Sequence, residues 1–207
     1  MKVVVYGATG KSGSRILTEL TSRGHQVVAV ARNTASLPAS VEAVQDDLSD
    51  VAKIASIIKG ADAVVSAYAP PMDDTDQVIG VTERQVAAIE KNGGPRLIVV
   101  GGAASLEVAP GVTLLASGHL PAEWVPIATS HSKVLDLLKT TSIDWTYFSP
   151  AAFFEPGERT GKFRLGTDTL IADENHQSRI SLEDYAIALV DELEVPKHHR
   201  ARFTIGY

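Results

Sequence analysis

Cysteine is absent from this 207-residue sequence. Its absence excludes disulfides, thiolate catalysis and cysteine-based metal sites, and it is typical of cytoplasmic proteins. An excess of basic residues is lacking as well, because 19 Lys and Arg stand against 25 Asp and Glu, which gives a formal net charge of -6. Such a surface does not attract a polyanion, so we expect no nucleic-acid partner.

Long hydrophobic runs are also missing. The first apolar run, residues 3–6, stops at a glycine-rich turn and is far too short for a signal-peptide core or a membrane span. We therefore expect a cytoplasmic monomer or homodimer without a membrane partner. A hydrophobic fraction of 44% and a charged fraction of 21% are typical of a globular chain, and the length fits one domain over residues 1–207.

Short apolar segments alternate with amphipathic ones along the first 150 residues. The segments that predict strands are residues 2–7, 25–32, 43–47, 61–67, 95–102 and 144–150. The segments that predict helices are residues 13–24, 52–58, 77–91 and 130–139. This alternation predicts an α/β fold with a doubly wound, mostly parallel Rossmann sheet and helices on both faces.

The pattern loosens after Pro150. Residues 161–165 and 169–173 resemble short strands, Ser181 to Asp184 form a capping box that opens a helix through about Leu193, and residues 201–207 predict a last strand. Because this stretch is too short for an independent substrate domain, we expect residues 151–207 to form a substrate-side flank or lid of the same domain.

The turn after the first strand carries two overlapping phosphate-binding patterns. Residues 6–16 read YGATGKSGSRI and include Gly10-Lys11-Ser12, the last three letters of a P-loop. The same turn places Gly7, Gly10 and Gly13 at GxxGxxG spacing.

The dinucleotide interpretation fits this turn better than the P-loop. A P-loop requires a glycine five residues before Gly10, where the sequence has Val5 within the strand. A dinucleotide loop needs one glycine for the tight turn, a later one so that amides approach the pyrophosphate, and another for close packing of helix and strand. Lys11-Ser12 after Gly10 is then either a coincidence or an extra positive charge near the phosphate.

Arg32 distinguishes between the two nicotinamide cofactors. It ends the second strand, where NAD-binding folds place an acidic residue for the ribose 2′-hydroxyl. A guanidinium suits a 2′-phosphate, so we expect NADP(H) in preference to NAD(H), with Asn33, Thr9 and Lys11 as helpers. The alternative for Arg32 is a solvated surface arginine.

Further cofactor contacts are expected at the ends of the third and fourth strands. The segment DDLSD resembles one that holds adenine, with Asp47 and Leu48 as the candidates, whereas Asp46 and Asp50 fit turn and cap positions. Ala67 and Tyr68 follow the fourth strand and are expected beside the cofactor, although an aromatic residue there is equally consistent with simple packing.

Nearly the whole chain resembles one family. The segments GATGKSGSRI, RLIVVGGAASLEVAPG, SIDWTYFSPAAFFEPGERTGKFRL and SRISLEDYAIALVDELE are similar to NmrA-like, atypical short-chain dehydrogenase/reductases, a group with NAD(P)H-binding proteins, NADH-flavin reductases and biliverdin reductase B-like enzymes. The resemblance implies a cofactor along the carboxyl ends of the strands, and it places Gly101, Ser105 and Pro150 near the nicotinamide.

The Tyr-xxx-Lys pair of ordinary short-chain dehydrogenases is absent. Lys133 would be its lysine, but the partner position holds Thr129. This absence argues against alcohol dehydrogenation and sugar-nucleotide epimerisation, which need that acid–base group. A flavin acting as acceptor rather than as a tightly bound cofactor, or another small planar acceptor, avoids the need. The alternative is a redox sensor that binds NADP(H) without efficient turnover.

Three residues are candidates for catalysis. Ser105 is a candidate for bonding the carboxamide or substrate, or for turning its loop, and Tyr68 is the second. His131 shares the apolar face of its helix, so it either borders the core or delivers a proton.

Two aromatic and two imidazole side chains complete the set. Phe153 and Phe154 fit either a ring-stacking wall or core. His198-His199 lacks acidic neighbours in the sequence and predicts a solvated turn, so we expect no metal site.

Overall fold

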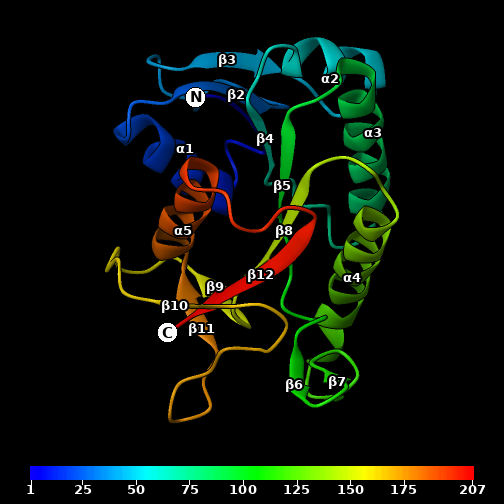
Figure 1. The fold of residues 1–207 in the computed structure, drawn as a ribbon, viewed down its shortest axis with the longest axis vertical. Helices are drawn as coiled ribbons and strands as arrows, with labels where there is room; N and C mark the ends of the chain where they lie inside the picture. Colours follow the sequence, from blue (N-terminus) through cyan, green and yellow to red (C-terminus); the bar gives the residue numbers. More distant parts are fainter.

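The structure is a computed structural model that describes the backbone of residues 1–207 and every side chain except that of Asn92. Its centre is an eight-stranded sheet in the order β10-β12-β8-β5-β4-β1-β2-β3 (Figure 1). The strands are β1 (Lys2–Tyr6), β2 (Gln26–Ala31), β3 (Glu42–Gln45), β4 (Ala63–Ser66), β5 (Arg96–Val100), β8 (Trp145–Ser149), β10 (Arg164–Gly166) and β12 (Ala201–Gly206). Neighbouring strands run parallel except β10, which is antiparallel to β12.

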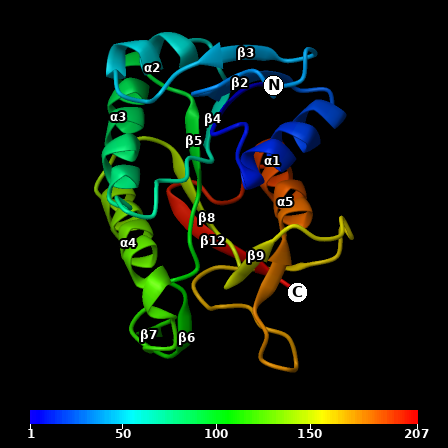
Figure 2. The ribbon, with the colours of Figure 1, turned by 180° about the vertical axis from the view of Figure 1, so that it is seen from behind.

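Helices cover both faces of the sheet, as Figures 1 and 2 show from opposite sides. α1 (Lys11–Ser22) and α5 (Leu182–Glu194) pack together on one face. The other face carries α2 (Val51–Ile58), α3 (Gln77–Asn92) and α4 (Val125–Lys139), the last preceded by the 3₁₀ turn η1 (Ala122–Trp124). This architecture confirms the predicted doubly wound, mostly parallel sheet. Among the residues described, no helix is both long enough and apolar enough to cross a membrane.

Two small sheets lie outside the main one. β6 (Glu107–Ala109) pairs with β7 (Val112–Thr113), and β9 (Phe153–Glu155) pairs in parallel with β11 (Arg179–Ser181). Both pairs follow carboxyl ends of main strands, since β6 comes after β5 and β9 comes after β8. They therefore extend the edge of the sheet at which a Rossmann fold binds its ligands.

The first strand shows why a continuous apolar run forms the middle of the sheet. Val3 and Val5 point into the core beneath α1 and α5, whereas Val4 and Tyr6 point into the core beneath the other three helices. Both faces of the strand are buried, so alternation between apolar and polar residues is not required.

The order of strands reverses beside β1. The chain continues from β1 to β2 and β3 on one side, then crosses to β4 on the other side. Ligands of open α/β sheets bind outside the carboxyl ends of the strands at such a reversal. The residues that follow β1 and β4 are therefore the place to look for a site.

Some predicted elements differ from those observed. α4 begins at Val125 rather than Ser130, because Pro126 lies in the first turn, where its missing N–H is not needed. Residues 169–173 do not form a strand; only Thr169 makes an isolated bridge, to Glu107. Ile171 instead packs against glycines of β10 and β12.

The capping box forms in one direction only. The Ser181 hydroxyl accepts a hydrogen bond of 3.0 Å from the Asp184 amide, as predicted. The Asp184 carboxylate does not bond back to Ser181 but accepts hydrogen bonds from the Gly161 amide, at 2.8 Å, and from the hydroxyls of Thr160 and Tyr207. It thereby fastens the segment after β9 to the start of α5.

Candidate dinucleotide-binding site

The loop between β1 and α1 requires glycine at two positions. Gly7 has a φ of +74°, and a Cβ there would lie 2.3 Å from the carbonyl oxygen of Ala67, at the end of β4. A Cβ on Gly13 would lie 2.1 Å from the carbonyl oxygen of Gly7. The loop therefore turns tightly between the ends of β1 and β4, and α1 packs directly against it.

The third glycine and the amides beside it leave room for an anion. Gly10 caps α1 in an extended conformation, and a Cβ there would approach only the Gly7 carbonyl, at 3.1 Å. The amides of Lys11, Ser12 and Gly13 have no acceptor in the part of the chain that the structure describes. Unpaired amides at the positive end of a helix fit a phosphate group, so these residues suit a dinucleotide.

A cleft of about 290 Å³ opens beside this loop. It brings together nine of the residues predicted from the sequence, which are Gly7, Thr9, Gly10, Arg32, Asn33, Asp47, Leu48, Ala67 and Tyr68. They come from the ends of β1, β2, β3 and β4, so segments far apart in the chain meet at the strand reversal. Lys11, Ser12 and Gly13 lie in the adjoining first turn of α1 and do not line the cleft.

Arg32 enters the cleft without a partner. Its side chain is exposed and forms no hydrogen bond or ion pair with any residue described. The next side chain is engaged in the turn, since the Asn33 amide oxygen accepts a hydrogen bond of 2.9 Å from the Ala35 amide. The cleft therefore presents one free guanidinium at the position predicted for the ribose.

Five residues line the cleft that the sequence did not indicate as cofactor contacts, namely Tyr6, Val30, Ala31, Asp46 and Ala69. Two of them, Tyr6 and Asp46, have polar side chains. The Tyr6 hydroxyl is buried and makes no hydrogen bond to the residues described. Burial raises the pKa of Tyr6 well above its ordinary value, and the negative charge of Asp46 adds to this effect. Asp46 accepts a 3.3 Å hydrogen bond from the Leu48 amide and lies 3.2 Å from the Lys53 ammonium. The one feature of the sequence that could have indicated Tyr6 and Asp46 is their position at the carboxyl end of a predicted strand.

The expected adenine contacts lie in the turn after β3. The Asp47 carboxylate accepts hydrogen bonds from the Ser49 amide and hydroxyl, at 3.0 and 2.6 Å, which hold its pKa below the usual value. Leu48 is buried with a φ of 64°. Asp50 caps α2 through the Ala52 amide, the role that the sequence suggested as its alternative.

Tyr68 lies on the Arg32 side of the site. Its hydroxyl donates a hydrogen bond of 3.1 Å to the Gln77 side chain. Burial raises the pKa of Tyr68, although the positive charge of Arg32 opposes the shift. The phenol therefore stays protonated at neutral pH and is available as a hydrogen-bond donor but not as a base.

The ends of β5 and β8 meet beside His131. Gly101 has no room for a side chain, because a Cβ would lie 2.3 Å from the Tyr147 ring. The Tyr147 hydroxyl accepts a hydrogen bond from the Gly102 amide, at 2.9 Å, and donates one to the His131 carbonyl, at 3.0 Å. Pro150 is buried directly after β8.

The imidazole of His131 is held neutral. Burial lowers the pKa of His131 from 6.5 to about 4, and its Nδ1 is buried without a partner among the residues described. A Cβ on Gly102 would lie 3.2 Å from the Cβ of His131, so the side chain borders the end of β5. The imidazole of His131 is therefore uncharged at neutral pH.

Ser105 is tied to the last strand instead of the cleft. Its hydroxyl accepts a hydrogen bond of 3.0 Å from Arg202 of β12, which also pairs with Asp168. Thr129 and Lys133, at the two positions of the missing pair, bond elsewhere: the Thr129 hydroxyl donates to the Val125 carbonyl, and the Lys133 ammonium lies 3.1 Å from the Asp76 carboxylate.

The structure places the remaining aromatic and imidazole side chains in different surroundings. Phe154 packs against Tyr185 in the core, with ring centroids 4.6 Å apart, while 62% of Phe153 is exposed. The predicted solvated turn without acidic neighbours is wrong for His198, which lies 2.7 Å from Glu192 and stacks on Phe203. His199 is exposed but lies 2.9 Å from Asp144.

Comparisons with known proteins identify the family and agree with the fold. The chain matches the NAD(P)H-binding family over residues 7–196. It is 45% identical to a Burkholderia pseudomallei protein provisionally described as exported, with both chains fully covered and a TM-score of 0.92. It is 42% identical to a Bacteroides thetaiotaomicron protein provisionally described as an epimerase, covering 100% and 96% of the two chains, with a TM-score of 0.92.

A third solved structure also matches the whole chain. A Streptococcus pneumoniae protein provisionally described as an NADH-flavin reductase is 34% identical, with 100% and 99% of the two chains covered and a TM-score of 0.91. The resemblance to NmrA-like atypical short-chain dehydrogenase/reductases is thereby confirmed. The chain belongs to the NAD(P)H-binding family.

Proposed function

We propose that the protein is a reductase that prefers NADPH and passes hydride to a flavin, a quinone or a similar planar acceptor. The observation that carries the cofactor preference is the unpaired guanidinium of Arg32, which shares one cleft with the glycine loop. The free amides of α1 bind the pyrophosphate, and Arg32 binds the 2′-phosphate.

The lack of an acid–base pair supports the choice of acceptor. The reduced nicotinamide, when bound, supplies a proton with two electrons as hydride, and any further proton that a planar acceptor takes up comes from water. The protein then only has to hold the two rings at the right distance and orientation. Gly101 and Pro150, at the ends of β5 and β8, border the nicotinamide, and the neutral His131 beside them excludes water from it.

A turnover experiment tests this function. Purified protein is mixed with NADPH and either FMN or a water-soluble quinone, and the loss of the reduced nicotinamide is followed by its absorbance. We expect consumption of NADPH that depends on both acceptor and enzyme. Tight binding of NADPH without consumption, across a broad set of planar acceptors, would contradict the reductase and favour a redox sensor.

Gly10→Val tests whether turnover depends on binding at the glycine loop. Valine accepts the extended backbone of Gly10, with φ -74° and ψ 173°, and its Cβ approaches only the Gly7 carbonyl. The variant should therefore fold, while the added side chain blocks the approach of the pyrophosphate. Turnover and NADPH binding should both be lost, with an unchanged circular dichroism spectrum.

A further inference from the structure

Two arginines remain unpaired among the ten in the chain. Eight arginine side chains bond to an acidic side chain or a backbone carbonyl, namely Arg15, Arg23, Arg84, Arg96, Arg159, Arg164, Arg200 and Arg202. Arg32 and Arg179 have no such partner in the residues that the structure covers. Arg32 lines the dinucleotide cleft, and Arg179 lines a second cavity, of about 620 Å³.

The second cavity lies over the small sheet of β9 and β11. Arg179 and Phe153 are directly paired across these parallel strands, so their side chains project from the same face of the sheet. The opposite face is buried, because Phe154 packs against Tyr185 and only 2% of Ile180 is exposed. A bare aromatic ring and a free guanidinium therefore stand side by side on the open face.

The position of this cavity suits an acceptor site. β9 begins three residues after Pro150, which ends β8 at the carboxyl edge of the sheet. Figures 1 and 2 both show β9 and β11 at the end of the molecule opposite β3, whose end borders the dinucleotide cleft. The two cavities share no lining residue, so a ligand in one does not occupy the space of the other.

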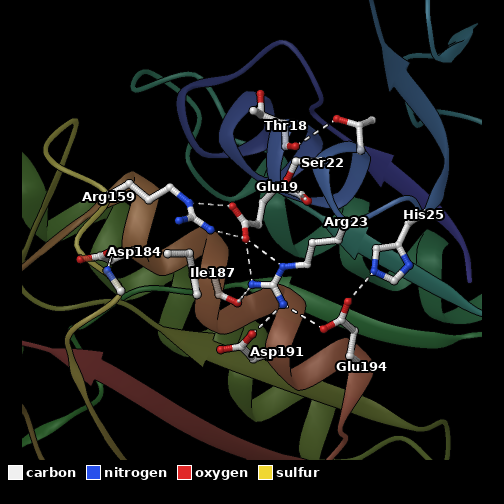
Figure 3. Close-up of polar contacts among 12 residues, drawn as sticks. Thr18, Glu19, Ser22, Arg23, His25, Arg159, Asp184, Ile187, Asp191 and Glu194 are labelled. Atoms are coloured by element: carbon white, nitrogen blue, oxygen red, sulfur yellow. Dashed lines mark hydrogen bonds and ion pairs between the residues drawn. The ribbon is translucent and has the colours of Figure 1, made fainter.

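A third hollow is lined by charged side chains that are all paired, in contrast to Arg179. The hollow between α1 and α5, of about 360 Å³, is lined by Glu19 and Arg159. Arg159 bonds to both carboxylate oxygens of Glu19, and Arg23 joins Glu19 to Asp191 and Glu194 (Figure 3). These charges pair with one another, whereas the guanidinium of Arg179 has no acceptor among the side chains and carbonyls that the structure describes.

The other polar groups of the cavity limit the charge of its ligand. Glu155 and Glu158 line it with His176, and Ser181 is engaged with the Asp184 amide and the Glu158 carbonyl. Two carboxylates near one guanidinium disfavour a polyanion. They are compatible with a ligand that carries a single anionic group directed at Arg179.

We propose that this cavity binds the acceptor, and that the acceptor is a planar aromatic molecule with one anionic arm. The ring lies against Phe153, and the phosphate or carboxylate at the end of the arm pairs with Arg179. The identification of the ligand as the acceptor rests on the proposed reductase function, but the existence of the binding site does not depend on turnover.

FMN and riboflavin test the site, because they share a ring and differ in the terminal phosphate. Binding is measured from flavin fluorescence anisotropy with the full chain, with and without NADP⁺, which fills the dinucleotide site but cannot reduce the flavin. We expect FMN to bind about tenfold more tightly than riboflavin, and Arg179→Gln to remove this preference while Arg179→Lys retains part of it. Equal affinities for the two flavins, or an unchanged FMN affinity in Arg179→Gln, would overturn the proposal.

Matched variants separate charge from packing. Phe153→Ala should weaken both flavins by a similar factor, because the lost contact is with the shared ring. Glu155→Gln, in the same cavity, should leave FMN affinity equal or higher, and Lys59→Gln, an exposed lysine of α2's end, should not change it. A loss of FMN affinity in Lys59→Gln equal to that in Arg179→Gln would show that overall charge, not this site, attracts the phosphate.

Failure of this proposal differs from failure of the reductase. If NADPH is consumed with a neutral quinone but the affinity for FMN is unchanged in Arg179→Gln, the proposed acceptor site is wrong and the reductase function stands. If FMN binds through Arg179 but no acceptor is reduced, the site stands and the reductase is wrong.

Discussion

Exchange of Arg32 for glutamine or glutamate should change the choice between NADPH and NADH. Because Arg32 has no partner in the described structure, its removal breaks no contact within the protein, and the free energy of unfolding should not change. A charge-assisted hydrogen bond to the 2′-phosphate, reduced for solvent exposure, contributes about 1.5–2 kcal/mol. Arg32→Gln should therefore raise the Kd for NADPH roughly 10- to 30-fold.

Arg32→Glu adds repulsion to this loss. At a water-like dielectric constant, a carboxylate about 4 Å from a phosphate costs about 1 kcal/mol more, which is roughly another fivefold in Kd. NADH lacks the 2′-phosphate and should bind to both variants with nearly the wild-type Kd.

The assay is titration of each cofactor at fixed ionic strength, followed by the fluorescence of the reduced nicotinamide. Lys11→Gln is the control, because Lys11 is an exposed residue beside the pyrophosphate loop and should affect both cofactors equally. Equal losses of NADPH and NADH affinity in the Arg32 variants would refute the assignment of Arg32 to the 2′-phosphate.

Three further predictions concern stability and protonation. Gly13→Ala should lower the free energy of unfolding by roughly 2–3 kcal/mol, because the new Cβ would lie 2.1 Å from the Gly7 carbonyl; an unchanged urea midpoint would contradict the packing role. Burial alone would raise the pKa of Glu19, but hydrogen bonds from Arg159 and Arg23 outweigh it, so the pKa is lowered. Glu19→Gln should therefore lower the free energy of unfolding by about 2 kcal/mol at pH 7. This difference between variant and wild type should disappear as the pH falls below about 4.3, the pKa in the unfolded chain, and then through the lower pKa of the folded protein. Urea unfolding at several pH values measures the difference. Because burial lowers the pKa of His131 to about 4, its ring should titrate near that pH in an NMR experiment. The pH profile of turnover near 6.5 should therefore be the same in the wild type and in His131→Asn; an inflection near 6.5 that disappears in the variant would contradict the lowered pKa.

The phosphate loop is the part of the site most accessible from the sequence. Gly7 and Gly13 are dictated by local geometry, and the strand reversal follows from the alternation of elements, so their neighbourhood is predictable. Tyr6 and Asp46 were missed as cleft residues because burial and turn formation explain them equally well. Whether a strand-end side chain faces a cleft depends on which strand lies next to it.

The flank after β8 was less predictable. β9 and β11 have three residues each, too few for apolar alternation to register, and they pair only because the fold brings them together. Residues 169–173 have an apolar pattern like that of a strand, but Ile171 uses it to cover two glycines. The Arg179–Phe153 pair thus depends on tertiary pairing that no local pattern reveals.

The position of β12 has a consequence for biosynthesis. Residues 201–206 lie between β8 and β10 in the sheet, although they are synthesised after both of these strands. Until they leave the ribosome, β8, with the sequence WTYFS, has an open edge that is rich in aromatic residues and prone to aggregation. A nascent chain stalled at residue 200 should therefore require chaperone protection that the released protein does not need.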